Sequence, residues 1–214
     1  NLSDLSGFEN LTTISGQLRM EFLDSLTSLA SFSSLNSVGG DLYIYEFDEL
    51  TSLYGLHNVN SVNGEITIFF NEQLTDISVL KNLDPSGITD LIIGLNYNLS
   101  DCSINSFCTY LNNGGNNTIA ENSLDESGCN DADEVLANCE NLAKVSFPMF
   151  YDTNEDGIQN AGEPFFPAAS INISPTDQTV FANELNGGAV FLEFGTYTFS
   201  YNHAGTPNFN LTLA

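Results

Sequence analysis

The chain has 214 residues, enough for one or two domains with a hydrophobic core, and its 42% hydrophobic content excludes a disordered chain. Its 28 acidic residues stand against three basic ones, for a net charge of −25. Such a surface repels nucleic acid and anionic lipid and attracts divalent cations. No apolar run reaches the length of a membrane span, so no membrane insertion is expected.

A repeat of 24 residues organises the first part of the chain. Each copy contains a segment like residues 40–45, in which polar and apolar residues alternate as in a strand with one buried face. Another column changes from Phe47 to Asn71 and Asn96, whose amides we expect to bond the backbone at a corner. A fixed period of this length is typical of a solenoid, in which the copies stack on one another. The copies begin at Leu5, Leu29, Leu53 and Ile77.

Four cysteines follow in one stretch, without a Cys-x-x-Cys pair or a nearby histidine: Cys102, Cys108, Cys129 and Cys139. Two disulfides in an oxidising compartment are therefore favoured over a zinc site. Three connectivities are open. Predicted helices at residues 103–111 and about 130–138 separate the cysteines within each segment by about 9 Å or more, beyond the reach of a disulfide. Bonds between the segments are expected, and the similar distance of Cys102 and Cys129 from a preceding strand favours Cys102–Cys129 with Cys108–Cys139.

Residues 102–141 are predicted to cap the solenoid, because an open end exposes unpaired strand edges and a cut core. The cap contains both helices, with Asn130 as the expected N-cap of the second, and a short fifth rung at residues 118–120. The first domain is expected to span residues 1–143. Since the chain begins inside the repeat pattern and shows no signal peptide, we expect a piece of a longer polypeptide or filament.

The pattern changes after about residue 142, where short alternating runs follow one another. Their spacing of roughly 8–12 residues is typical of a small β-sandwich. We expect an Ig-like β-sandwich over residues 144–214 that ends before its last strand. The runs are residues 145–150, 169–173, 179–181, 189–194, 196–201 and 209–213.

Residues 152–163 match the calcium-loop pattern D-x-[DN]-x-[DN]-G-x5-E without a mismatch. Gly157 permits the sharp turn of such a loop, whereas Pro164 directly after it argues against the flanking helix of an EF-hand. We expect a structural calcium ion that fixes neighbouring strands; the alternative is an acidic, solvated turn. The predicted ligands are Asp152, Asn154, Asp156, the carbonyl of Ile158, Asn160 and Glu163.

The outward side of the predicted strands carries Tyr43, Tyr45 and Phe69, flanked by carboxylates. Exposed aromatic side chains on a sheet bind sugar rings or protein partners, so these three form the candidate ligand-binding residues. The alternative is ordinary cross-strand packing on a solvated sheet. No catalytic residue is expected, because His57 and His203 lack a neighbouring nucleophile and no nucleophile elbow or phosphate loop is present.

Residues 1–141 resemble the receptor L-domain, a leucine-rich-repeat-like right-handed β-helix. The resemblance rests on the L-x-[IM] columns at residues 18–20 and 42–44, with Ile66 in place of leucine in the third copy, and on the cysteine-containing cap. Residues 145–214 resemble the B-type domain of serine-aspartate-repeat adhesins through residues 150–157 and 162–164. The second resemblance implies a calcium-binding, stiff stalk unit. Together they imply a large secreted or cell-surface protein of a Gram-negative bacterium.

The resulting expectation is a mainly β protein. A right-handed β-helix/LRR-like solenoid with a small helical disulfide cap precedes a small Ig-like β-sandwich. The expected function is non-enzymatic and extracellular: adhesion or ligand binding by the solenoid, on a calcium-stabilised stalk, with a protein or glycan as ligand. Two alternatives stay open, a purely structural spacer of a surface filament and an accessory region of a larger secreted enzyme.

Overall fold

The computed structural model describes residues 2–124, 128–139, 142–147, 170–176, 178–181, 188–192, 195–201 and 209–213. Contacts between Cα atoms divide the chain into two compact units, Asn1–Glu140 and Asn141–Ala214.

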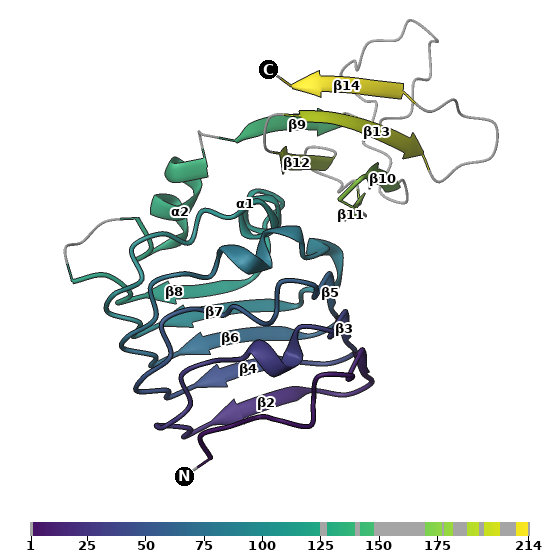
Figure 1. Cartoon of the computed structure of the whole chain (residues 1–214). Helices are drawn as coiled ribbons and strands as arrows, with labels where there is room; N and C mark the ends of the chain where they lie inside the picture. The colour runs from purple at the N-terminus through teal and green to yellow at the C-terminus, as the bar shows by residue number, and fades with distance from the viewer. Residues whose placement is uncertain are drawn as a thin grey trace, which may run out of the picture. The chain divides into compact units, whose positions relative to one another are not determined.

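The first unit is built on a five-stranded parallel sheet with the order β2-β4-β6-β7-β8 (Figure 1). Leu18 pairs with Leu42, and Leu42 pairs with Ile66, so the 24-residue repeat sets the register of the first strands. Because side chains alternate along a strand, these residues point to the same face, where Leu42 and Ile66 are fully buried. The strands are β2 (Leu18–Glu21), β4 (Leu42–Tyr45), β6 (Glu65–Phe69), β7 (Asp90–Gly94) and β8 (Asn117–Ala120).

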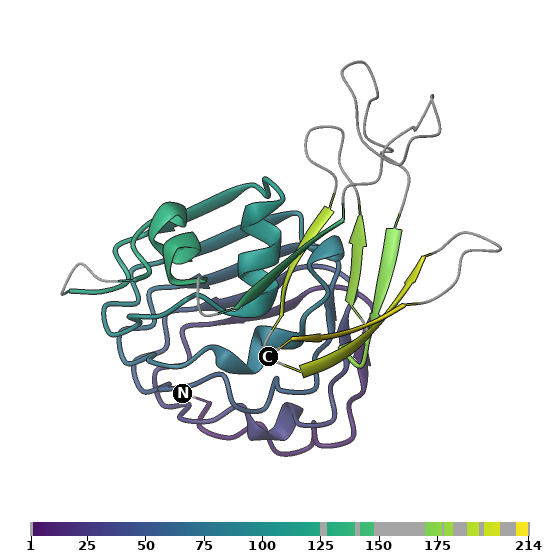
Figure 2. The same cartoon turned by 90° about the horizontal axis from the view of Figure 1, so that it is seen from above.

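A second parallel sheet, with the order β1-β3-β5, and three short 3-10 helices complete the repeats. Seen from above in Figure 2, these segments of successive repeats overlie one another. The residues that begin the copies pack inward, since Leu29, Leu53 and Ile77 are at most 1% exposed. The elements are β1 (Thr13–Ile14), β3 (Ser37–Val38), β5 (Ser61–Val62), η1 (Ala30–Phe32), η2 (Ser78–Asn82) and η3 (Pro85–Gly87).

Two α-helices follow the repeats, α1 (Asn105–Asn112) and α2 (Ala132–Asn138). Both predicted helices are present, and the predicted fifth rung is β8. The predicted N-cap of α2 is wrong, because Asp131 rather than Asn130 accepts the N–H of Glu134, at 2.8 Å. The side-chain oxygen of Asn130 instead accepts the N–H groups of Asn122 and Ser123, which follow β8 at the end of the sheet.

The second unit contains two antiparallel sheets, with the orders β11-β10-β13-β14 and β12-β9. Strands β10, β12 and β13 contribute side chains to one buried cluster: Ile171, Ile173, Val190, Leu192, Tyr197 and Phe199. The strands are β9 (Ala143–Phe147), β10 (Ser170–Ser174), β11 (Gln178–Phe181), β12 (Gly188–Leu192), β13 (Gly195–Tyr201) and β14 (Phe209–Leu213).

The predicted fold class, a mainly β right-handed β-helix/LRR-like solenoid followed by an Ig-like β-sandwich, is wrong. The described residues have mixed α/β content, with two parallel sheets and two helices, and the second unit has small antiparallel sheets of four and two strands. The repeat period identifies which side chains face inward, but it does not fix the conformation of the segments between the strands. Likewise, the regular spacing of the alternating runs predicts how many strands there are, but it does not determine which strands pair.

Candidate functional site

The strand face is the outward side of the five-stranded sheet, and the predicted ligand-binding residues lie together on it. Tyr43 stands in register with Arg19, and Tyr45 stands in register with Glu21 and Phe69. The three aromatic side chains are partly exposed. The structure therefore places all three predicted residues on one surface.

Four aromatic rings form a contiguous group on this face, which we call the aromatic cluster: Phe22, Tyr43, Tyr45 and Phe69. The rings of Tyr43 and Tyr45 stack with centroids 5.8 Å apart, and those of Tyr45 and Phe69 stack at 6.0 Å with planes only 2° apart. Phe22 meets Tyr45 edge-on at 5.5 Å. Such separations are typical of favourable aromatic pairs, so the rings stabilise one another's positions.

Phe22 is the member of the cluster that the sequence did not predict. Strand alternation would turn the residue after Glu21 inward, yet Phe22 is 57% exposed. Its φ of +57° turns the chain at the end of β2, and the residue after each strand of the sheet has a similar left-handed φ. The equivalent residues after β4 and β8 are Glu46 and Glu121, and these charged residues were the signal that the position faces solvent.

Gly94 makes room for the Phe69 ring. The two residues are paired between β6 and β7, and a Cβ built on Gly94 would lie 2.6 Å from Cε2 of Phe69. A side chain at this position would push the ring aside, so in this arrangement the ring lies over the bare backbone of β7. Gly94 is the next residue in register after Tyr45 and Phe69, and because it has no side chain, the aromatic cluster ends at Phe69.

A guanidinium covers one end of the cluster. The Cζ atom of Arg19 lies 4.0 Å from the ring centroid of Tyr43, a cation–π contact. The same guanidinium donates to Oε2 of Glu21 through Nη2 at 2.7 Å and through Nε at 3.1 Å. The hydrogen bond to Glu21 raises the pKa of Arg19 above its ordinary value, so the group remains charged.

Carboxylates lie at the starts of the same strands, where Asp41, Glu65 and Asp90 occupy equivalent positions. Asp41 accepts the N–H of Glu65 at 2.9 Å, and Glu65 accepts the hydroxyl of Thr67 at 2.5 Å. These bonds hold the acidic side chains close to the sheet, beside the rings.

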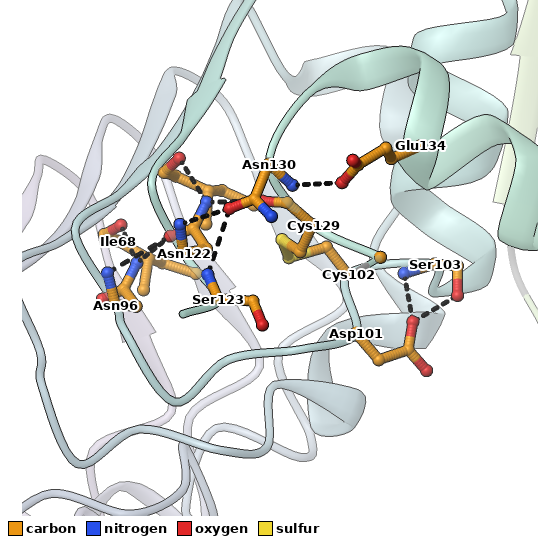
Figure 3. Close-up of a disulfide and its surroundings, with 12 residues drawn as sticks. Ile68, Asn96, Asp101, Cys102, Ser103, Asn122, Ser123, Cys129, Asn130 and Glu134 are labelled. Carbon is orange, nitrogen blue, oxygen red and sulfur yellow. Dashed lines mark hydrogen bonds between the residues drawn. A yellow bond between two sulfur atoms is a disulfide. The ribbon is translucent and has the colours of Figure 1, made fainter. Parts of the chain in front are cut away.

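Behind the strand ends, buried asparagines form a hydrogen-bonded ladder (Figure 3). Asn71, Asn96 and Asn122 are fully buried, and each donates its side-chain amide to a strand carbonyl, such as that of Ile68 from Asn96 at 2.9 Å. Nδ2 of Asn71 also donates to Oδ1 of Asn96 at 3.1 Å, and Nδ2 of Asn96 donates to Oδ1 of Asn122 at 2.8 Å. The expected corner role of asparagine is confirmed, with Asn122 as a further member.

The ladder ends on the cap. Asn130 accepts the N–H groups of Asn122 and Ser123 through Oδ1, at 2.9 and 3.1 Å, and its own N–H donates to Glu134 of α2. The side chain of Asn130 thus takes the place of a next repeat's asparagine at the point where the repeats stop (Figure 3).

Two disulfides fasten this cap, with Cα atoms 5.4 Å apart for Cys102–Cys129 and 6.0 Å apart for Cys108–Cys139. This is the pairing that the sequence favoured. All four cysteines are fully buried. Disulfides indicate an oxidising environment, extracellular or periplasmic.

Two hollows lie near the ends of the sheet. One of about 590 Å³ beside the cap is lined by Glu121, Asn130 and Glu134, but Asn130 and Glu134 already bond each other. The other, of about 370 Å³ at the β2 end, is mainly apolar and includes Phe8 and Leu18. Within the described residues, no group of three or more histidine, cysteine, aspartate or glutamate side chains is arranged to hold a metal ion.

The predicted calcium ligands Asp152, Asn154, Asp156, Ile158, Asn160 and Glu163 lie outside the described residues. These ligands therefore rest on the sequence pattern alone, and calcium binding stays a prediction.

Comparison with known proteins identifies no relative: no family model matches the chain, and no match is found among curated proteins or solved structures. The resemblances to the receptor L-domain and to the B-type adhesin domain stay predictions based on their motifs. In the part of the chain that the structure describes, no helix is both long and apolar enough to cross a membrane.

Proposed function

We propose that the chain is a non-enzymatic adhesion or ligand-binding part of a secreted or cell-surface protein, and that it binds its ligand on the strand face. The observation that carries this proposal is the contiguity of the aromatic cluster, in which Tyr43, Tyr45 and Phe69 stack and stay partly exposed. Partly exposed, adjoining rings are common at binding surfaces. The two disulfides support a location in an oxidising compartment.

The base under the rings is closely packed and hydrogen-bonded, which favours a binding role. The inward residues of the same strands, such as Leu42, Ile44 and Ile68, are fully buried, and buried asparagines bond the strand ends. A surface held in one conformation before binding loses little entropy when a ligand docks. A sheet is therefore a suitable support for a preformed site.

Calcium is the proposed structural ion of the second unit. The supporting observation is the complete match of residues 152–163 to a calcium loop, in which Asp152 and Asp156 would supply carboxylate oxygens and Glu163 two more. The net charge of −25 also favours uptake of a divalent cation.

A binding screen tests the proposed role. The wild-type chain and a Tyr43→Ala/Tyr45→Ala variant are compared on an array of glycans and on a panel of purified extracellular proteins. Tyr54→Ala is the matched control, because Tyr54 is 59% exposed but lies between β4 and β5, outside the strands of this sheet. We expect at least one ligand that the double variant loses and the control retains.

A ligand that both variants bind equally would place the binding site elsewhere on the chain. If no glycan or protein binds the wild type, the spacer alternative replaces the binding role. Circular dichroism of each variant separates loss of binding from loss of folding.

A further inference from the structure

The strand face already holds one guanidinium group, which shows the chemistry that it accommodates. Arg19 lies 4.0 Å above the Tyr43 ring while its nitrogens donate to Glu21. The planar cation is thus held between an aromatic face and a carboxylate at the surface, with the Arg19 side chain 44% exposed. Arginine suits this arrangement because it stacks on rings and bonds carboxylates through a flat fork of donors.

The rest of the cluster offers two further rings without a cation of their own. Tyr45 and Phe69 stand one and two strands beyond Glu21 in the same row, so Glu21 adjoins Tyr45, whereas Glu65 lies at the opposite end of β6 from Phe69. The other basic residues of the chain, Lys81 and Lys144, lie in η2 and in the second unit. Arg19 is the single arginine of the chain, so a second guanidinium on this face belongs to another molecule.

The charge of the chain favours such a molecule. With 28 acidic and three basic residues, the chain attracts cationic partners over distances of about one Debye length and repels anionic ones. Beside the cluster, Asp41, Glu65 and Asp90 add negative charge on the strand face itself. Complementary charge mainly raises the rate of encounter and excludes wrong partners.

We propose that the strand face binds an arginine-bearing cationic segment of a partner polypeptide. One guanidinium of that segment lies on the rings of Tyr45 and Phe69, as Arg19 does on Tyr43, and a further arginine of the segment donates to the carboxylates at the starts of the strands. The inference assumes that the strand face is the binding surface, as proposed for the function of the chain, and it adds the chemical class of the ligand.

Isothermal titration calorimetry of the full chain with a nine-residue polyarginine peptide tests this inference. We expect Tyr45→Ala and Phe69→Leu to weaken binding about tenfold, which corresponds to the loss of a desolvated cation–π contact. The Phe69→Leu variant keeps an apolar side chain over Gly94, so it separates the role of the ring from that of packing. Tyr54→Ala should bind as the wild type does.

Two charge variants separate a specific site from general attraction. Glu65→Gln and Asp133→Asn each remove one negative charge, but Asp133 is exposed on α2, away from the strand face. Binding to the face predicts a larger loss for Glu65→Gln, and diffuse attraction predicts equal losses. Equal losses, together with unchanged binding by the aromatic variants, would overturn the inference.

The outcomes also distinguish this inference from the proposed function. If a neutral glycan binds the wild type and is lost in Tyr45→Ala, while polyarginine binding is unchanged, the face is a binding site for another ligand class. If neither probe depends on Tyr45 or Phe69, both proposals fail. Thermal melts monitored by circular dichroism confirm that each variant is folded.

Discussion

Asn96 is the centre of the asparagine ladder, and replacing it by alanine tests whether the ladder holds the repeats together. Its side chain accepts the N–H and Nδ2 of Asn71 at 3.0 and 3.1 Å and donates to the Ile68 carbonyl and to Oδ1 of Asn122 at 2.9 and 2.8 Å. Asn96→Ala removes all four bonds in a site that is fully buried.

The expected loss of stability follows from these bonds. A buried group left without a partner costs about 1–3 kcal/mol, and each further lost bond costs about 0.5–1.5 kcal/mol. One orphaned Asn71 amide and three lost bonds together give about 3–7 kcal/mol, a large share of the about 5–15 kcal/mol typical of a folded domain.

Urea unfolding monitored by far-UV circular dichroism measures this loss, because the chain has no tryptophan for fluorescence. Hydrogen exchange of the Asn71 amide reports on the first unit alone. The control is Asn36→Ala, since Asn36 is exposed and its side-chain hydrogen bond to the Asn58 carbonyl is long at 3.4 Å. A loss for Asn96→Ala no greater than that for Asn36→Ala, with Asn71 still protected from exchange, would refute the reasoning.

Three further predictions concern the loop, the cap and its tyrosine. Calcium should raise the melting temperature of the second unit and EDTA should reverse this, whereas Asp152→Ala/Asp156→Ala should not respond; an unchanged melt in EDTA with no bound metal by elemental analysis contradicts the site. Cys108→Ser/Cys139→Ser opens a link between residues 31 apart in sequence and should lower the free energy of unfolding in urea by about 3–4 kcal/mol. Burial, with the nearby charge of Asp90, raises the pKa of Tyr110 to about 12. The unfolded state loses that proton first, at about pH 10, so stability is intact below pH 10 and falls as pH rises toward 12. Tyr110→Phe should remove this fall, and the tyrosine absorbance titration of the variant should lack the late-ionising step of the wild type.

The repeat columns made the inward positions and the strand register predictable, because equivalent residues of successive copies pair directly, as Leu18, Leu42 and Ile66 do. The aromatic cluster could be predicted for the same reason, as Tyr45 and Phe69 occupy one column. Phe22 was missed, because a left-handed backbone conformation overrides strand alternation.

The cap shows where local signals mislead. Asn130 and Asp131 are both good N-cap residues, and sequence alone does not choose between them. The N–H groups of Asn122 and Ser123 at the end of the sheet donate to the Asn130 side chain, which leaves Asp131 to begin α2. The fold class was wrong for a related reason, because periodicity carries no information on the segments that connect the strands.

The asparagine ladder makes the two ends of the sheet unequal. From Asn71 onward, hydrogen bonds of asparagine side chains hold the strand ends, and this series of bonds ends at the disulfide-linked cap. In the earlier copies the same column holds Leu23 and Phe47, which have no side-chain amide. Since stacked repeats open from their weakest neighbour contact, we expect fraying to start at β2 and to stop near β6. The aromatic cluster spans β2, β4 and β6, the strands that we expect to fray. A bound partner would therefore hold these three strands together and would stabilise the unit where it is weakest.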